Sequence, residues 1–400
     1  MNKNLSMAVA GAVLAMGASA ANAGITIPAG DWTIDIGGNV NAYYTHTKYS
    51  GDLKSDTKGA FGNKSANQIS TGLLPSAVGI GGKTRQNDLD IAFQFTFFTG
   101  SDSGTGTAFG SNSLNIRQAY MTFGDKSWGT IKMGRDLGIF GSDAILSDMT
   151  LLGVGAGAGN NGSSTLGRIG SGYQYADWKG QISYASPNWN GFSFNAGLME
   201  GYDNAIDSTQ HNLGYEGKVG YEWAGDFAGK VWAGALYNKH EGNATVRGYK
   251  TEGWEIGGKV DVAGFGLVGY YYDGQGLSGA SSTRLAGYPG GLNGGVNFLG
   301  VSETDDKGGY VQATYTIPNV GTKLGVSWGE SKSSADVGIG DFKNKSWIVG
   351  AYHPLTKSLN LVAEYTHNKI EGTNADNATA AQQAMDGKAK TLSLGAILFF

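Results

Sequence analysis

Two acidic residues, Asp143 and Asp148, are the first candidates for a functional role. They lie in the stretch 136–167, which also contains Phe140 and Leu151 and is less polar than a long solvent-exposed loop is expected to be. A partly apolar stretch with embedded acids can fold back and pack against the rest of the protein. With basic residues opposite, its carboxylates would create an electric field across a narrow aqueous path and orient charged or dipolar solutes.

Other residue types argue against several kinds of site. The chain has no cysteine, so a thiolate metal site or a cysteine nucleophile is impossible. The histidines show neither metal-ligand spacing nor a triad pattern; they are His46, His211, His240, His353 and His367. A hydrolase is an open alternative, for which His367 beside Thr366 is the nearest candidate pair. We expect no metal, no cofactor and no enzymatic activity.

The elements that would position these charges are strands. In the stretch 388–400, Leu392, Leu394 and Leu398 recur at alternate positions, with Ser393 between the first two. Period-two alternation indicates a strand with one apolar and one polar face. We expect the leucines to face lipid and Ser393 to face inward. An apolar strand at the end of a chain would be an aggregation-prone edge unless it pairs with the first strand and closes a barrel.

About 16 segments show this alternation, and each approaches the ~9–11 residues of a tilted membrane-spanning strand. They are 31–48, 71–85, 88–101, 113–124, 128–135, 170–186, 191–202, 209–223, 226–241, 250–263, 265–275, 308–318, 321–333, 342–353, 358–371 and 388–400. The connections between them alternate between short turns and long loops. The predicted fold class is therefore all-β: a membrane-spanning antiparallel β-barrel of about 16 strands with short periplasmic turns and long extracellular loops.

The first 23 residues predict a cleaved signal peptide, with Lys3 before an apolar core and Ala21-Asn22-Ala23 as the cleavage site. We expect residues 24–400 to form one barrel. The terminal strand that ends in Phe400 resembles the closing strand of outer-membrane β-barrel proteins, which implies the outer membrane of a Gram-negative bacterium. Without Lys3, the chain has 28 basic and 33 acidic residues, a net charge of −5. This mildly acidic balance argues against a nucleic-acid partner.

Arg117 lies inside the segment 113–124. An arginine on the lipid face of a barrel costs about 2–4 kcal/mol near mid-depth. We therefore expect its side chain to face the lumen or to lie near an interface. Two interpretations stay open: Arg117 lines the narrowest part of an aqueous path, or it is a structural arginine paired with carboxylates of the wall.

Several stretches of the chain resemble the Gram-negative general-diffusion porins. They are NIRQAY at 115–120, GTIKMGRD at 129–136, YASPNWNGFSFNAG at 184–197, LLPSAVG at 73–79 and the terminal Phe400. The resemblance covers essentially the whole mature chain. It implies a homotrimer in outer-membrane lipid, a third loop that bends into the pore, and a terminal Phe400 that the barrel-assembly machinery reads.

The resemblance also implies a charged pore constriction. Its basic side would be formed by Arg117 and Arg168, joined by Lys83 or Arg85 and by Arg135. Its acidic side would be formed by Asp143 and Asp148. The family's third loop often carries a Pro-Glu-Phe-like segment, whereas this chain has DMTLLGVG at 148–155.

The function that this reasoning predicts is a water-filled channel for passive diffusion of small hydrophilic solutes and ions. One alternative is a substrate-selective porin, whose sign would be an aromatic ladder along the lumen; Tyr43, Trp232 and Tyr310 are the inward candidates. A second is an adhesin or structural barrel that works through the loop 276–307. Ion preference stays open, because the net acidity favours cations and arginines at the constriction would favour anions.

Overall fold

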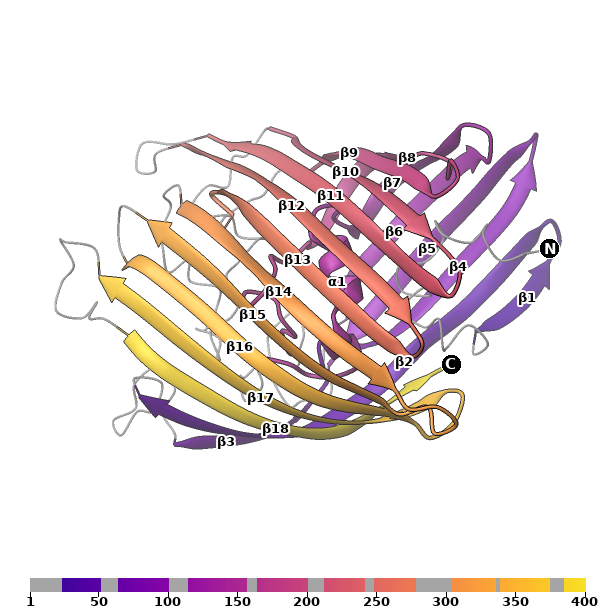
Figure 1. Cartoon of the computed structure of the whole chain (residues 1–400). Coiled ribbons are helices and arrows are strands. Elements are labelled where there is room, and N and C mark those ends of the chain that lie inside the picture. The colour runs from indigo at the N-terminus through magenta and orange to yellow at the C-terminus, as the bar shows by residue number, and fades with distance from the viewer. Residues whose placement is uncertain are drawn as a thin grey trace.

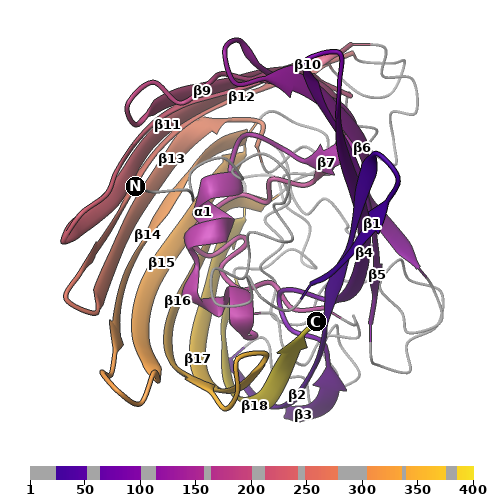
Figure 2. The same ribbon diagram turned by 90° about the vertical axis from the view of Figure 1, so that its right-hand side faces the viewer.

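Alternating inward and outward side chains produce one antiparallel sheet that curls into a closed ring (Figures 1 and 2). The computed structural model describes residues 24–51, 64–100, 114–156, 164–200, 212–241, 248–277, 304–335, 339–374 and 385–400. The expected signal peptide, residues 1–23, and most of the loop 276–307 lie outside the described residues. In the part that is described, no helix is both long and apolar enough to cross a membrane.

The strands are β1 (Ile25–Ala29), β2 (Trp32–Gly51), β3 (Ser65–Ser70), β4 (Ser76–Gln86), β5 (Leu89–Thr99), β6 (Asn115–Asp125), β7 (Gly129–Leu137), β8 (Trp178–Ala185), β9 (Phe192–Met199), β10 (Gly214–Trp223), β11 (Phe227–His240), β12 (Tyr249–Val262), β13 (Phe265–Gln275), β14 (Thr304–Thr316), β15 (Lys323–Ala335), β16 (Ile339–Pro354), β17 (Leu359–Asn374) and β18 (Met385–Phe399). Two short helices, α1 (Ser142–Ser147) and η1 (Met149–Leu152), lie between β7 and β8.

The register shows how these strands form a barrel of 16 wall strands. Both β3 and β4 pair with β2, through Tyr43↔Ser70 and Thr33↔Lys83 respectively, so together they make one interrupted wall strand. On the other edge of β2, β18 pairs with residues 39–51 and β1 with residues 32–36, so β1 continues the line of β18. The predicted antiparallel β-barrel of about 16 strands and the closure of the last strand onto the first are confirmed.

Side chains on β18 alternate as the sequence predicts. Leu392, Leu394 and Leu398 are 44%, 46% and 42% exposed on the outer face, whereas Ser393 is only 1% exposed on the inner face. Tight turns connect the strands at the end of the barrel where β18 finishes. The turn between β4 and β5 has two consecutive residues with positive φ, Asn87 (47°) and Asp88 (64°). This backbone matches the twist of a two-residue hairpin.

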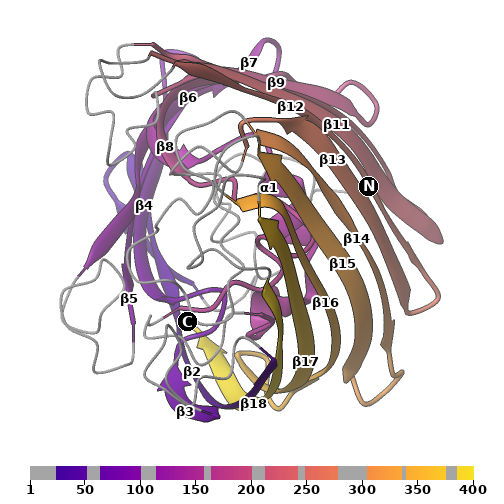
Figure 3. The same cartoon turned by 90° about the vertical axis from the view of Figure 1, so that its left-hand side faces the viewer.

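Two predicted segments lose their first residues to the loop inside the barrel. The segment 170–186 forms a wall strand only from Trp178, and residues 170–177 belong to the loop inside the barrel (Figure 3). Gly170 (φ 71°) and Asp177 (φ 58°) turn the chain there and interrupt the extended backbone. The segment 71–85 starts as β4 only at Ser76, because Leu73 donates its N–H to the Gly153 carbonyl of the inner loop at 2.9 Å instead of pairing in the sheet.

Candidate functional site

The described parts of the connection between β7 and β8 run inside the ring of strands. We call residues 138–177 the third loop; its described parts are 138–156 and 164–177. α1 lies within the barrel and is seen next to the inner face of β13 to β16 in Figure 2. The loop begins to turn inward at Gly138, whose N–H donates to the Asp177 carbonyl at 2.8 Å and so brings the two ends of the loop together. The predicted inward fold of this apolar stretch is therefore present.

The first leg of the third loop is held by two buried glutamates of the wall. Glu216 on β10 accepts the main-chain N–H groups of Ile139 and Phe140 through Oε2 at 2.6 and 2.9 Å. Its Oε1 forms an ion pair with the buried Lys179 of β8. Glu255 on β12 accepts the N–H of Gly141 at 2.9 Å. Both carboxylates thus satisfy main-chain groups that would otherwise be buried without a partner.

A third glutamate holds the middle of the loop. Glu364 on β17 accepts the N–H groups of Val154 and Gly155 through Oε2 at 2.9 and 2.7 Å. Its Oε1 accepts the hydroxyl of Tyr352 at 2.7 Å. Tyr43 of β2 donates its hydroxyl to the Leu152 carbonyl at 2.7 Å. The third loop is therefore bonded to the wall on strands far apart in sequence.

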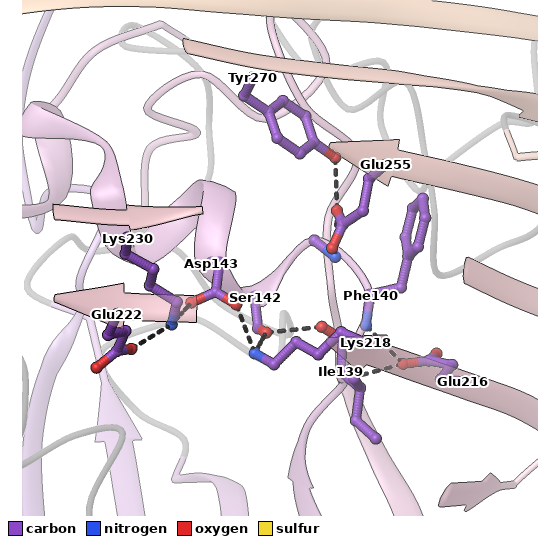
Figure 4. A network of polar contacts seen from close by, with 11 residues as sticks. Ile139, Phe140, Ser142, Asp143, Glu216, Lys218, Glu222, Lys230, Glu255 and Tyr270 are labelled. Carbon is purple, nitrogen blue, oxygen red and sulfur yellow. Dashed lines mark hydrogen bonds and ion pairs between the residues drawn. The ribbon is translucent and has the colours of Figure 1, made fainter. Parts of the chain in front are cut away.

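Asp143 in α1 lies between two lysines of the wall (Figure 4). Its Oδ2 accepts from Lys218 Nζ on β10 and its Oδ1 from Lys230 Nζ on β11, both at 2.7 Å. Lys218 also donates to the Ser142 hydroxyl at 2.9 Å, and Lys230 pairs with Glu222 at 3.0 Å. Burial raises the pKa of the Asp143 carboxyl, but the two lysines outweigh this effect and hold the pKa at about 2.

Asp148 points into the third loop itself. Its Oδ1 accepts the N–H of Thr150 at 2.9 Å and so caps η1. Its Oδ2 accepts the Tyr173 hydroxyl at 2.7 Å and the main-chain N–H of Arg168 at 3.2 Å. Burial and the nearby Asp148 charge raise the pKa of Tyr173 well above its ordinary value. Asp148 joins the two legs of the loop, a different place from the acidic pore face that the sequence predicts.

Arg168 also differs from its predicted place, because it belongs to the third loop and does not lie opposite it. The guanidinium is fully buried. Its Nε and Nη2 donate to the Ser327 hydroxyl of β15 at 2.8 and 2.6 Å, and its Nη1 donates to the Ser346 hydroxyl of β16 at 3.1 Å. Arg168 thus attaches the second leg of the loop to the wall.

Arg117 is only 5% exposed at the loop end of β6. Its guanidinium carbon lies 4.7 Å from the ring centre of Phe98 and 6.0 Å from that of Trp178. The register between β5 and β6 shifts beside Arg117, between Thr96 and Phe97. Such an irregularity re-aims a side chain, and here the charge avoids lipid by packing on aromatic rings.

The other three predicted cations are Lys83, Arg85 and Arg135. Lys83 and Arg85 lie near the tight turns, where Lys83 pairs with Asp35 at 3.0 Å and Arg85 pairs with Asp90 at 2.8 Å. Arg135 is exposed, and alternation along β7 puts it on the same outer face as Met133. Neither Asp143 nor Asp148 forms an ion pair with any of the five predicted cations within the described parts of the chain. Arg135 is close enough to Arg117 for the two positive charges to interact, whereas Arg168 lies in the third loop and Lys83 and Arg85 lie near the tight turns.

The inward aromatic residues pack beneath the third loop. Tyr310 donates its hydroxyl to the Ala144 carbonyl of α1 at 2.8 Å. Its ring lies 5.7 Å from Tyr173 of the loop and 5.9 Å from Tyr270 of the wall, and Tyr270 lies 6.4 Å from Trp232. All four rings are buried, so they form a packing layer and not the exposed ladder that a solute could follow.

Sequence reasoning missed the side chains that hold the loop: Glu216, Glu255, Glu364, Lys218 and Lys230. Each occupies an inward position of an alternating strand, between outward residues such as Tyr215 and Ile256. A charged residue at an inward position of a strand was the sequence feature that could have identified them as contacts of the loop. The described residues contain no cluster of His, Asp and Glu that could hold a metal ion.

A sequence model of the family described as Gram-negative porin matches residues 8–373 of the chain. The outer membrane channel DcaP of Acinetobacter baumannii aligns with a TM-score of 0.60 and 14% identity, over 93% of this chain and 99% of that one. OmpF of Salmonella typhi, solved in complex with daunomycin, aligns with a TM-score of 0.58 and 17% identity, over 94% of this chain and 100% of that one. The trimer form of OmpT from Vibrio cholerae aligns with a TM-score of 0.53 and 15% identity, over 92% of this chain and 99% of that one. No curated protein matches the chain by sequence.

Proposed function

The chain belongs to the Gram-negative porin family, and from this premise we propose that it forms a water-filled channel for passive diffusion of small hydrophilic solutes and ions. Family and fold make it an outer-membrane channel protein. A barrel of 16 strands is wider than a barrel of eight strands, in which side chains fill the interior. The observation that carries the proposal is the third loop, which lies within the barrel and is bonded to its wall at β10, β15 and β17.

We place the charged constriction of this channel at the third loop. Asp143 with Lys218 and Lys230 forms its loop side, since the lysines keep 17% and 29% of their side chains exposed. The wall strands β4 to β7 form the opposite side. Lys132 points inward there, over the ring of Tyr120 at 4.8 Å. In this proposal the buried Arg117 contributes its charge to the field, whereas Arg168 and Asp148 hold the loop in shape.

Export and assembly follow the same proposal. Residues 1–23 act as a cleaved signal peptide, and Phe400 marks the end that the barrel-assembly machinery reads. In support, Phe400 exchanges main-chain hydrogen bonds with Gly38 of β2, at 2.9 and 3.1 Å, and so completes the seam. The trimer form of OmpT supports a homotrimer. We assign no enzymatic activity and no cofactor to this channel.

Conductance is the direct test of the channel. In planar lipid bilayers the purified protein is expected to give stepwise conductance increments that are linear in voltage. Vesicles that carry it should swell in sugar solutions at rates that fall steeply with sugar size. If the protein inserts as a folded barrel but gives neither current nor swelling, the proposal is wrong, and the adhesin or structural barrel takes its place.

Asp143→Asn should shift the ion preference of the channel towards anions. The change removes one negative charge and leaves the positive charges of Lys218 and Lys230 at the constriction. The reversal potential in a salt gradient measures the shift. Asp148→Asn is the matched comparison, because within the described residues Asp148 accepts its hydrogen bonds from the loop itself and should change the reversal potential less. Equal shifts in the two variants would contradict this placement of the constriction.

The same carboxylate predicts a pH dependence. The pKa of Asp143 is held at about 2, below its ordinary 3.8, so the ionised form is stabilised in the folded channel. This stabilisation is present above about pH 4 and is lost as the pH falls towards 2. The Asp143 contribution, measured as the difference in reversal potential between wild type and Asp143→Asn, should stay constant from pH 8 to about 4 and decrease only below that.

A further inference from the structure

The outer face of β16, β17, β18 and β2 carries lysines in directly opposed positions. Lys345 on β16 lies opposite Lys369 on β17, which lies opposite Lys388 on β18. Two residues further along β18, Lys390 lies opposite Lys48 on β2. Like charges in directly opposed positions destabilise a sheet. A row of them therefore calls for negative charge from elsewhere.

Part of that negative charge comes from the protein. Glu371 pairs with Lys345 at 3.1 Å and also with Lys369, and Asp386 lies 3.5 Å from Lys369. The lysines of β18 and β2 are not compensated in this way. Lys48, Lys388 and Lys390 form no ion pair within the described ranges of the chain, and all three are exposed. We call these three residues the lysine patch.

The lysine patch lies on the outer surface of the barrel. Its neighbours along the chain, Thr47 on β2 and Ala389 and Thr391 on β18, are buried on the inner face. Because side chains alternate along a strand, the three lysines point away from the lumen. They also lie near the ends of β2 and β18 that are remote from Phe400, which are the ends joined by the long loops.

Towards the middle of the barrel the same outer face becomes apolar. Leu392, two residues from Lys390, is 44% exposed, and Tyr44 is 45% exposed opposite Leu394. Trp347 on β16 is 40% exposed and lies opposite His367, which in turn lies opposite Lys390. Exposed tryptophan and tyrosine mark the boundary between membrane hydrocarbon and headgroups. Two residues of a strand span about 7 Å, so the lysines stand at headgroup depth.

We propose that the lysine patch binds the phosphate groups of anionic lipids in the leaflet nearer the long loops, with the lipid chains lying on Leu392 and Tyr44. A lysine ammonium is a flexible point charge that suits phosphate, and its stem can extend along apolar surface to reach it. Charge complementarity points to the lipid phosphate, because the three ammonium groups are exposed and form no ion pair within the described ranges of the chain.

The test compares two double variants by native mass spectrometry of the detergent-solubilised protein with added lipid. Lys48→Gln/Lys390→Gln removes the opposed pair of the patch. Lys126→Gln/Lys357→Gln is the matched control, because it removes two exposed lysines from turns at the other end of the barrel. Phosphatidylglycerol adducts are expected to fall about tenfold in the patch variant only, as each lysine near a headgroup contributes several-fold. Phosphatidylcholine adducts should stay unchanged, and equimolar inorganic phosphate should not displace phosphatidylglycerol.

The other results would each overturn the proposal. Equal phosphatidylglycerol adducts in both variants would mean that the lysines only extend towards water. Equal loss of both lipids would indicate apolar contact without headgroup recognition, and displacement by inorganic phosphate would indicate a free-anion site. A changed number of subunits with unchanged lipid would make the patch a contact between copies. The thermal unfolding of both variants should be unchanged, which verifies that lipid binding is compared between folded barrels.

Discussion

Glu216→Ala is expected to release the first leg of the third loop and to destabilise the folded barrel by about 3–5 kcal/mol. The N–H groups of Ile139 and Phe140 lose their acceptor, and Lys179 is left buried without its carboxylate partner. Removing the carboxylate partner of a buried cation is the larger of these two penalties. Thermal unfolding in detergent measures the loss of stability. Single-channel recordings should show more current noise, because the freed leg can move in the lumen.

Glu222→Ala is the matched control for that variant. Glu222 lies on the same strand, and its side chain is 55% exposed where it pairs with Lys230. An exposed ion pair contributes at most about 1 kcal/mol. We therefore expect little change in unfolding and no added noise. If Glu216→Ala behaves like Glu222→Ala, the carboxylate of Glu216 does not hold the loop.

Arg168→Ala is expected to widen the passage and to destabilise the barrel by about 2–5 kcal/mol. The change removes the donors to Ser327 and Ser346, and it leaves a cavity where a fully buried side chain lay. The second leg of the loop then loses its attachment to β15 and β16. Vesicle swelling should accordingly extend to larger sugars than the wild-type channel admits.

Arg168→Lys separates attachment from charge. Lysine keeps the positive charge but lacks the planar fork that reaches two hydroxyls at once. If attachment is the role of Arg168, the lysine variant should recover only part of the stability and of the wild-type size limit. If the lysine variant has the wild-type size limit and Arg168→Ala changes only the reversal potential, Arg168 acts as a pore charge, as the sequence analysis predicts.

The alternating strands explain why the fold could be predicted from one sequence. The residues of each wall strand alternate between an outward and an inward face, as Leu392 and Ser393 do on β18, so its sequence alone indicates both faces. Most strands also pair with the strand that precedes or follows them along the chain. The prediction of strands fails where residues contact the third loop, or belong to it, and do not pair with a neighbouring strand of the sheet. Residues 71–75 and 170–177 read as strand because their own composition does not reveal that they contact the loop or form part of it.

The candidate site was predictable only in part, for a physical reason. Asp143 stands out because an acid in an apolar stretch needs a partner when it is buried. Its partners Lys218 and Lys230 lie 75 and 87 residues away along the chain. A pairing over such a distance cannot be predicted from a local sequence pattern. The family resemblance places Arg168 across the pore, but local spacing cannot distinguish an arginine that faces the loop from one that belongs to it.

The wall glutamates contact the third loop through its main chain, and this has an evolutionary consequence. Glu216, Glu255 and Glu364 all accept peptide N–H groups, which every residue except proline offers in the same form. Side chains of the loop can therefore be exchanged without loss of these bonds. A lineage could retune what the channel admits through substitutions within 138–156, other than at Asp148, while these bonds to the wall stay unchanged, so solute preference can diverge faster than the barrel that carries it.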